Sequence, residues 1–246
     1  MIYISKAAER HIINQGKFII RMISPGQKLK IPRDRGLGPL GRVDHSTIEP
    51  GGLIPMHPHQ NDEILSYMRR GTMLHKDSHG LSEALHGTHL MMMNAGSGLY
   101  HEEAVDDADK ERVDMLQIFF RPEADDLEPT IQFNTLSSAN SINEWRLIGG
   151  PEKSGAPLKI RSEGWVYDIH LNGSAIETPE LNNLTAFLYV FDGNIEIAGK
   201  SIVLESGDGL LIKDERIQVV SKIASDLVLF LVDEKSNYSR SGAYSG

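Results

Sequence analysis

The sequence predicts an all-β fold with a metal centre in its first half. Short segments of strand-forming residues alternate with turns rich in glycine, proline and aspartate, and no convincing long amphipathic helix occurs in this half. One of these segments ends in His57-Pro58-His59. Alternate side chains of a strand point to the same side of the sheet, so the two imidazoles share one face. A third imidazole, His101, follows after a glycine-punctuated hairpin region.

Composition limits the classes of protein that need to be considered. The chain has 246 residues, a formal net charge of −9 and no cysteine. Its length allows one large domain or two ordinary ones, and the lack of cysteine excludes disulfides, thiolate metal sites and cysteine nucleophiles. The acidic balance argues against direct contact with nucleic acid. No signal peptide is evident, and no apolar run approaches the roughly 18 residues of a membrane span. We therefore predict a cytoplasmic protein with no nucleic-acid or membrane partner.

The first half is predicted to be a series of strands connected by turns. Residues 1–23 contain short strands, and residues 24–42 form an irregular loop rich in glycine, proline and basic residues. After this loop the pattern of strand, turn and strand is regular enough for a complete β domain. Its predicted strands cover residues 42–48, 53–59, 62–68, 72–75, 90–93, 99–101 and 115–120.

The second half repeats this organisation after a connector. The connector begins with an acidic, proline-bounded stretch, and a short helix is predicted within it around residues 137–145. A second β unit follows, and its segment 187–193 parallels segment 64–71, which indicates a weak internal duplication. The final residues are rich in serine, glycine and tyrosine and are expected to be flexible. The predicted division is a metal-binding domain at 1–121, a connector at 122–163, a second β domain at 164–235 and a flexible tail at 236–246.

The residues around His57 and His101 are the candidate metal ligands. Three imidazoles and a carboxylate that converge from two strands suit a divalent transition metal such as iron. The same ligands also accept Mn, Ni, Co or Cu, and geometry decides among these metals. A second group of histidines lies between the two segments, and we interpret it as hairpin and loop residues, with a weak surface metal site as the alternative. This group comprises His75, His79, His86 and His89.

Two motifs resemble those of the cupin superfamily. The pattern Gly51-x5-His57-x-His59-x3-Glu63-x7-Gly71 resembles the first cupin motif, one residue longer at its end. The stretch that runs through Gly96-Ser97-Gly98 to His101-Glu102-Glu103 resembles the second cupin motif in the form typical of pirins. A strand–turn–strand sequence pattern common in cupins also occurs in the second half, at residues 204–212. The chain is thus similar to the pirin family over most of its N-terminal half, and the pattern at residues 204–212 extends the resemblance into the second half.

This resemblance implies a bicupin, in which two tandem jelly-roll β-barrels pack face to face with few short helices. In the family, the N-terminal barrel binds a metal, usually iron, and the C-terminal barrel typically lacks it. Matched onto this sequence, the implied ligands are His57, His59, His101 and Glu103. Some bacterial pirins open flavonols such as quercetin with dioxygen, whereas the animal relative is a nuclear protein that modulates transcription-factor binding.

The sequence leaves three functions open. The first is a quercetinase-like dioxygenase with Fe(II) or another divalent metal, a flavonol and O2 as substrates, and Glu103, or as second choice Glu63, as the proton acceptor. The second is a non-enzymatic, metal- or redox-responsive regulator that binds a partner protein. The third is a metal-free bicupin that acts as a binding module. One departure from the family concerns the pocket wall, because pirins often have Arg-Gly-Phe-Glu where this chain has Gln60-Asn61-Asp62-Glu63.

Overall fold

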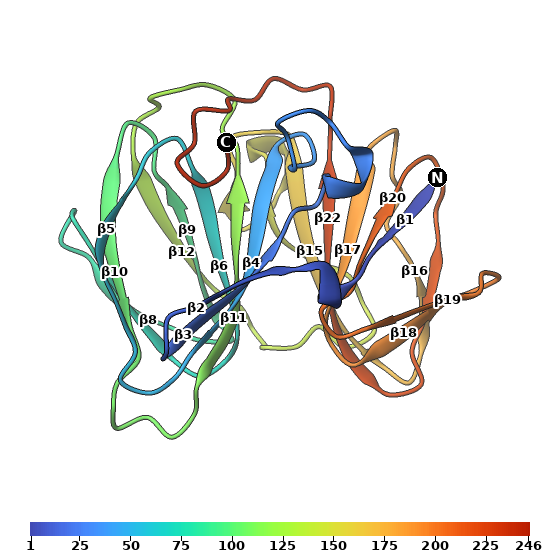
Figure 1. Ribbon diagram of the computed structural model, residues 1–246, viewed down its shortest axis with the longest axis horizontal. Coiled ribbons are helices and arrows are strands. Elements are labelled where there is room, and N and C mark those ends of the chain that lie inside the picture. Colours follow the sequence, from blue (N-terminus) through green and yellow to red (C-terminus); the bar gives the residue numbers. More distant parts are fainter.

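Two large β-sheets face each other across the middle of the molecule (Figure 1). The structure is a computed structural model that describes residues 1–246. Each large sheet forms one barrel together with a smaller sheet on its outer side. The chain is nearly all β, as predicted, and its only helices are three short 3₁₀ turns. These are η1 (Ala7–Glu9), η2 (Gln27–Leu29) and η3 (Glu152–Ser154).

The N-terminal barrel consists of a seven-stranded and a four-stranded sheet. The larger sheet has the order β12 (Thr130–Thr135), β9 (His89–Asn94), β6 (Glu63–Arg70), β11 (Val113–Phe120), β4 (Leu40–Ile48), β3 (Phe18–Ile23) and β2 (His11–Asn14). The smaller sheet has the order β5 (Leu53–His59), β10 (Leu99–Ala104), β7 (Met73–Asp77) and β8 (Ser82–Leu85). All pairings within these two sheets are antiparallel.

The C-terminal barrel repeats this arrangement. Its larger sheet has the order β1 (Ile2–Ser5), β20 (Gly209–Ile212), β17 (Thr185–Asp192), β22 (Ala224–Val232), β15 (Gly164–Asn172), β13 (Arg146–Gly150) and β14 (Leu158–Lys159). Its smaller sheet has the order β16 (Ala175–Glu177), β21 (Gln218–Val220), β18 (Asn194–Ile197) and β19 (Ile202–Glu205). Strands β6 and β17, which contain most of the two segments that parallel each other in sequence, occupy the same place in their sheets.

The central strands are apolar on both faces because both faces are buried. On β11, Leu116, Ile118 and Phe120 belong to the core between the two barrels, whereas Met115 and Phe119 point into the N-terminal barrel. The core between the barrels contains 22 buried residues from both large sheets and is larger than the core of either barrel. Burial of this much apolar surface holds the barrels face to face, as the resemblance implied.

Strand membership departs from the predicted domain boundaries. Strand β1, at the very start of the chain, pairs with β20 of the C-terminal barrel, with Ile2 opposite Ile212. Strand β12 lies in the predicted connector but pairs with β9 of the N-terminal barrel. Local composition carries no information about these long-range pairings. The helix predicted at 137–145 is wrong: the segment is irregular, and Ser141 and Asn143 form backbone hydrogen bonds with His170 instead.

The tail also differs from the prediction of a flexible end. Residues 239–246 return to the N-terminal barrel and cross its upper rim, where the red ribbon meets β4 and β6 in Figure 1. Backbone hydrogen bonds hold this segment, among them Ser239 N–H to Pro122 O and Ala243 N–H to Gln60 O. No helix of the structure is both long and apolar enough to cross a membrane.

Candidate metal centre

Adjacent strands of the small N-terminal sheet bring the three predicted histidine ligands together. His57 and His59 lie on β5, and His101 lies directly opposite His57 on β10. Alternation turns all three side chains into the barrel. The distance from Nε2 of His101 is 2.9 Å to Nε2 of His57 and 3.0 Å to Nε2 of His59. The three ligand nitrogens all lie within 4.8 Å of one another.

The hydrogen bonds of these rings favour a cation at the point where they meet. Nδ1 of His57 lies 2.9 Å from the carbonyl oxygen of Pro55, which can only accept, so Nδ1 carries the proton and Nε2 a lone pair. Nδ1 of His59 makes a longer contact, 3.5 Å, with Oδ2 of Asp62. Lone pairs that face one another at this distance repel. Two ligands at right angles on a metal with bonds of about 2.1 Å are ~3.0 Å apart, so the observed spacing fits a shared metal ion.

A fourth histidine, His75, lies on the other side of His101 from the group. Nδ1 of His75 is 3.4 Å from Nδ1 of His101, and Nε2 of His75 is 3.1 Å from Oδ2 of Asp77. His75 is fully buried on β7, the strand on the other side of β10. The chain Asp77–His75–His101 therefore orients the His101 ring with its Nε2 toward the other two imidazoles. The interpretation of His75 as a hairpin residue missed this role, although alternation on residues 73–77 places His75 and Asp77 on one face.

Glu103, the fourth predicted ligand, points into the same barrel but is not part of the histidine group. Its carboxylate is buried and accepts a hydrogen bond of 2.6 Å from Nε2 of Gln117. Burial raises the pKa of Glu103 to about 7, against the opposing effect of the Gln117 hydrogen bond. Burial also lowers the pKa of His57, and it lowers that of His101 further, with the neighbouring imidazoles adding to the effect. Buried imidazoles with lowered pKa values are neutral at pH 7, which is the form that binds metals.

Comparison with known proteins agrees with this architecture. The family model described as pirin matches residues 39–120, and the model described as quercetinase C-terminal cupin domain matches residues 147–232. The chain is a pirin-like bicupin. It is 27% identical to a quercetin 2,3-dioxygenase of Escherichia coli (strain K12) over 232 residues, which cover 94% of this chain and 98% of that protein. It is 26% identical to a pirin-like protein of Caulobacter vibrioides over 82% of this chain and 86% of that protein.

A solved structure with a bound metal also resembles the chain. The bacterial pirin YhhW from Escherichia coli in complex with nickel(II) superposes with a TM-score of 0.80 at 26% identity, over 94% of this chain and 99% of that one. The histidine group of this pirin-like bicupin and the nickel-bound relative together support a divalent metal in the N-terminal barrel.

Glu63, the second choice for a proton acceptor, lies outside the centre of this pirin-like bicupin. On β6, Leu65 and Tyr67 belong to the core between the barrels, and alternation puts Glu63 on that side too. Its carboxylate accepts hydrogen bonds from the backbone N–H and from Nε of Arg161, at 3.1 and 2.8 Å, and from the side chain of Asn94. Glu63 therefore joins the two halves of the molecule, and we do not retain it as a catalytic candidate.

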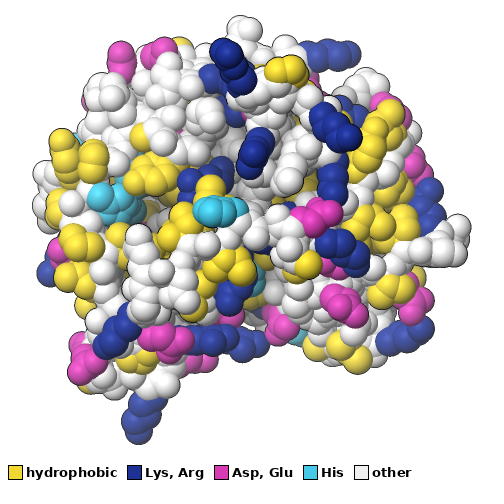
Figure 2. All heavy atoms as spheres, viewed as in Figure 1, with side chains coloured by type: hydrophobic (Ala, Val, Ile, Leu, Met, Phe, Trp, Pro, Cys, Tyr) yellow, Lys and Arg dark blue, Asp and Glu magenta, His cyan; other side chains and the backbone are white.

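The histidines of the pirin-like bicupin open into a pocket of about 500 Å³. Its polar lining includes His57, His59, Glu103 and Gln117, together with Gln15 and the ion pair of Arg42 and Asp44. Figure 2 shows exposed histidine beside hydrophobic side chains on the N-terminal barrel, in the left half of the view. The apolar part of the lining includes Ile13, Phe18, Ile20, Ile54, Phe119 and Tyr244. A mostly apolar lining with a few polar groups is typical of a small-molecule binding site.

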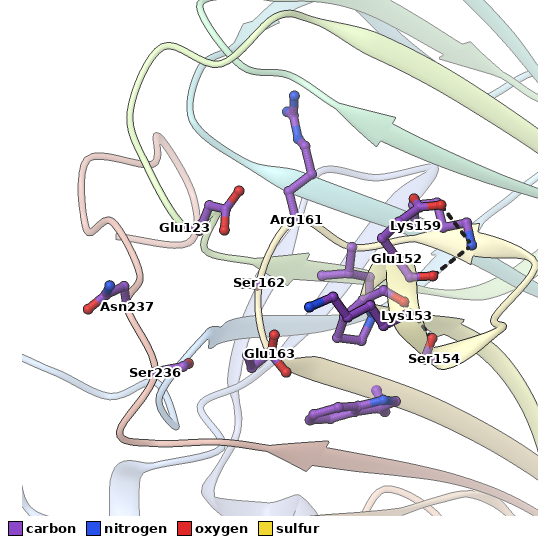
Figure 3. Close-up of a pocket in the computed structure, with 13 residues that line it drawn as sticks. Glu123, Glu152, Lys153, Ser154, Lys159, Arg161, Ser162, Glu163, Ser236 and Asn237 are labelled. Carbon is purple, nitrogen blue, oxygen red and sulfur yellow. Dashed lines mark hydrogen bonds and ion pairs between the residues drawn. The ribbon is translucent and has the colours of Figure 1, made fainter.

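A second pocket, of about 570 Å³, lies beside the connector and is shown in Figure 3. Its charged side chains are three acids and three bases, and only two of its lining residues are hydrophobic. Lys159 contacts the backbone oxygen and the carboxylate of Glu152, at 3.3 and 3.6 Å. Because its charges are balanced and it contains no group of metal ligands, we assign the chemistry to the histidine pocket.

Proposed function

We propose that this pirin-like bicupin is a metal-dependent dioxygenase that opens a flavonol such as quercetin with O2. The observation that carries the proposal is the convergence of three imidazole Nε2 atoms in a pocket that also holds a buried carboxylate and an aromatic wall. The E. coli relative named quercetin 2,3-dioxygenase, which matches nearly the whole chain, supports the substrate class. A cytoplasmic location and a partner protein remain predictions of the sequence.

In this proposal His57, His59, His101 and Glu103 hold the metal. Fe(II) is our first choice, and Ni, Mn, Co and Cu suit the same ligands. When bound, the metal supplies Lewis acidity toward the oxygens of the substrate. Side chains of the protein itself accept the proton of the substrate and exclude water from the pocket. The proposed binding of Glu103 requires its carboxylate to turn from Gln117 toward the imidazoles.

The carboxylate of Glu103 is also the proposed proton acceptor for the 3-hydroxyl group of the flavonol. It is the one carboxylate of the pocket whose only hydrogen-bond partner is a neutral amide, because Asp44 is paired with the guanidinium of Arg42 at 2.7 and 2.6 Å. In the structure the hydrogen bond from Gln117 holds the Glu103 carboxylate apart from the imidazoles, and we propose that Glu103 accepts the proton from this position. The apolar walls keep water away from the substrate and strengthen every polar interaction inside the pocket.

The test begins with the metal content of the untagged protein, measured by elemental analysis beside a His57→Ala variant. We expect about one metal ion per chain in the wild type and almost none in His57→Ala. His79→Ala is the matched control, because His79 is an exposed histidine on a neighbouring hairpin. Quercetin should then disappear with uptake of one O2 per molecule, as followed by absorbance and an oxygen electrode. A metal-loaded protein that takes up no oxygen with quercetin would contradict the proposed activity, and lack of metal after reconstitution would contradict the site.

A further inference from the structure

The segment of residues 239–246, called here the crossing segment, is fastened to the rim of the metal pocket through its backbone. The N–H groups of Tyr244 and Ser245 donate to the carboxylate of Asp62, with distances of 3.2 Å for Tyr244 and 2.9 Å for Ser245. Nε of Arg121, itself buried, donates to the carbonyl oxygen of Ser245 at 2.7 Å. Asp62, Arg121 and Ser245 are buried, so these bonds fix the backbone of the segment, whereas Tyr244 itself is 38% exposed.

Two glycines allow the crossing segment to lie this close to the barrel. A Cβ atom on Gly41 of β4 would lie 2.7 Å from Cα of Ser245. A Cβ atom on Gly242 would lie 2.6 Å from Oδ1 of Asp62 and 2.7 Å from the carbonyl oxygen of Asn61. Real Cβ atoms do not approach backbone atoms so closely, so a methyl group at either position would displace the segment.

The crossing segment delivers one aromatic ring to the pocket. The ring of Tyr244 lies 4.7 Å from that of His59 and is stacked on Phe119 at 5.6 Å, with 19° between the ring planes. The guanidinium of Arg42 lies 5.7 Å from the centres of both the Tyr244 and the Phe119 rings. Tyr244 lines the pocket together with His57, and its ring therefore borders the space beside the metal ligands.

Asp62 joins the crossing segment to a metal ligand. Its side chain is fully buried, and besides the two N–H groups of the segment it contacts Nδ1 of His59 at 3.5 Å. The carboxylate of Asp62 therefore holds the backbone of Tyr244 at the rim of the pocket.

We propose that Tyr244 is a specificity-determining residue that forms one wall of the metal pocket and packs against a planar aromatic ligand with a hydroxyl group next to a carbonyl group. This rests on the proposed function in so far as the ligand binds at the metal. The wall recognises the aromatic rings of the ligand and contributes nothing to a small ligand that reaches the metal without touching Tyr244.

The experiment measures binding of two probes to the Co(II)-loaded protein by visible absorption. The probes are 3-hydroxyflavone, which is planar and aromatic, and azide, which has three atoms. Tyr244→Ala removes the ring, whereas Gly41→Ala and Gly242→Ala displace the segment from two sides and leave the ring in the chain. Tyr244→Phe and Gly87→Ala are the controls, because the first keeps the ring and the second has room for a methyl group, with its nearest contact at 3.5 Å.

We expect the dissociation constant of 3-hydroxyflavone to rise about threefold to tenfold in Tyr244→Ala, Gly41→Ala and Gly242→Ala, which is the range of an aromatic contact. Azide binding and cobalt content should stay within twofold of the wild type in every variant, and both controls should bind 3-hydroxyflavone as the wild type does. Equal binding of 3-hydroxyflavone by all variants would contradict the proposed role of Tyr244 and would leave the dioxygenase proposal unaffected. A parallel loss of azide or cobalt would also overturn it, because the effect would then act on the metal ligands.

The two proposals fail in distinguishable ways. If the variants show the expected 3-hydroxyflavone affinities but the protein takes up no oxygen with quercetin, the role of Tyr244 is supported and the dioxygenase activity is contradicted. A wild-type protein that takes up no cobalt, or that takes it up and binds no 3-hydroxyflavone, overturns both.

Discussion

The N-terminal and C-terminal barrels have the same strand order, yet different side chains point into them. In the small N-terminal sheet His101 lies opposite His57 on one side and opposite Asp77 on the other. At the equivalent pairings of the small C-terminal sheet, Val219 lies opposite Ile176 and Ile197. The N-terminal barrel thus places imidazole and carboxylate groups where the C-terminal barrel places aliphatic ones.

The two interiors are stabilised in different ways. The C-terminal barrel buries a core of 16 apolar residues, and the one histidine of that domain, His170, lies outside this core and contacts Asp226 at 2.7 Å. The N-terminal barrel buries polar rings, each of which has a partner for its Nδ1 atom. Buried polar groups without partners are costly, so an inward-facing histidine is tolerated only where the surrounding residues satisfy it. The fold supplies the positions, and a few side chains decide whether a barrel can bind a metal.

The largest effect is expected when the C-terminal interior is copied into the N-terminal barrel. The double variant His57→Ile with His101→Val carries the aliphatic pair found at Ile176 and Val219. We expect its metal affinity to fall by more than the roughly 100-fold that loss of a hydrogen-bond partner of a ligand produces. The free energy of unfolding of the metal-free protein should fall by about 1 to 3 kcal/mol, because the buried Nδ1 atom of His75 loses its partner on His101. Elemental analysis and urea unfolding measure the two effects, and retained metal would contradict the assignment of the ligands.

The reverse change should damage the C-terminal barrel without creating a site. Val219→His puts one imidazole into an aliphatic interior, where it has no hydrogen-bond partner. We expect the free energy of unfolding to fall by about 3 kcal/mol, from an unsatisfied polar group and excess volume together. Urea unfolding of this variant is compared with that of Val203→His, in which the histidine replaces a 55% exposed valine on strand β19 of the same sheet. A gain of bound metal by Val219→His would show that topology alone is enough for a metal site.

A smaller effect is expected from the residue behind His101. His75→Leu keeps the volume of the side chain and removes the contact that orients the His101 ring. Loss of such a partner weakens metal binding by about 10- to 100-fold. The measurement is competition for the metal with a chelator, and His79→Ala from the exposed end of the same hairpin is the control. Unchanged affinity in His75→Leu would mean that the three metal-facing rings are positioned without help from β7.

The sequence contains local information about the site and little about the contacts that complete it. Alternation and motif spacing were enough to bring His57, His59 and His101 together. They did not predict which side of the sheet the Glu63 side chain is on. Both faces of β6 are buried, so its apolar pattern does not distinguish the face inside the barrel from the face between the barrels.

Contacts between distant parts of the chain were also beyond the sequence. The pairing of β1 with β20 and the packing of Tyr244 on His59 each join residues about 185 or more positions apart. A serine- and glycine-rich composition predicts flexibility, whereas hydrogen bonds to the buried side chains of Asp62 and Arg121 give the crossing segment a defined position. The internal duplication, by contrast, was detectable because β6 and β17 keep similar residues in equivalent places.

The smallest effect concerns how the C-terminal barrel holds the start of the chain. Asp208 accepts hydrogen bonds from Nζ of Lys6 at 2.7 Å and from the backbone N–H of Ala7 at 2.9 Å. Burial alone would raise the pKa of Asp208, but these donors lower it below its ordinary value of 3.8. A carboxyl group with a lowered pKa in the folded state stabilises the protein above pH 3.8, and this contribution is lost as the pH falls through the folded-state value.

Asp208→Asn should therefore destabilise the protein at pH 6 and have a smaller effect at pH 2.5, because the wild-type aspartate takes up a proton as the pH falls through its lowered folded-state pKa. Because Lys6 is 48% exposed, the difference at pH 6 should be below about 1 kcal/mol. Urea unfolding at the two pH values measures this difference.

Asp34→Asn is the comparison in the N-terminal barrel. Asp34 also has a lowered pKa, but it pairs with Arg121, a guanidinium with only 1% of its side chain exposed. Its loss at pH 6 should exceed that of Asp208→Asn, because water screens a buried ion pair less. Equal losses at both pH values in either variant would mean that the aspartate acts through packing and not through its charge.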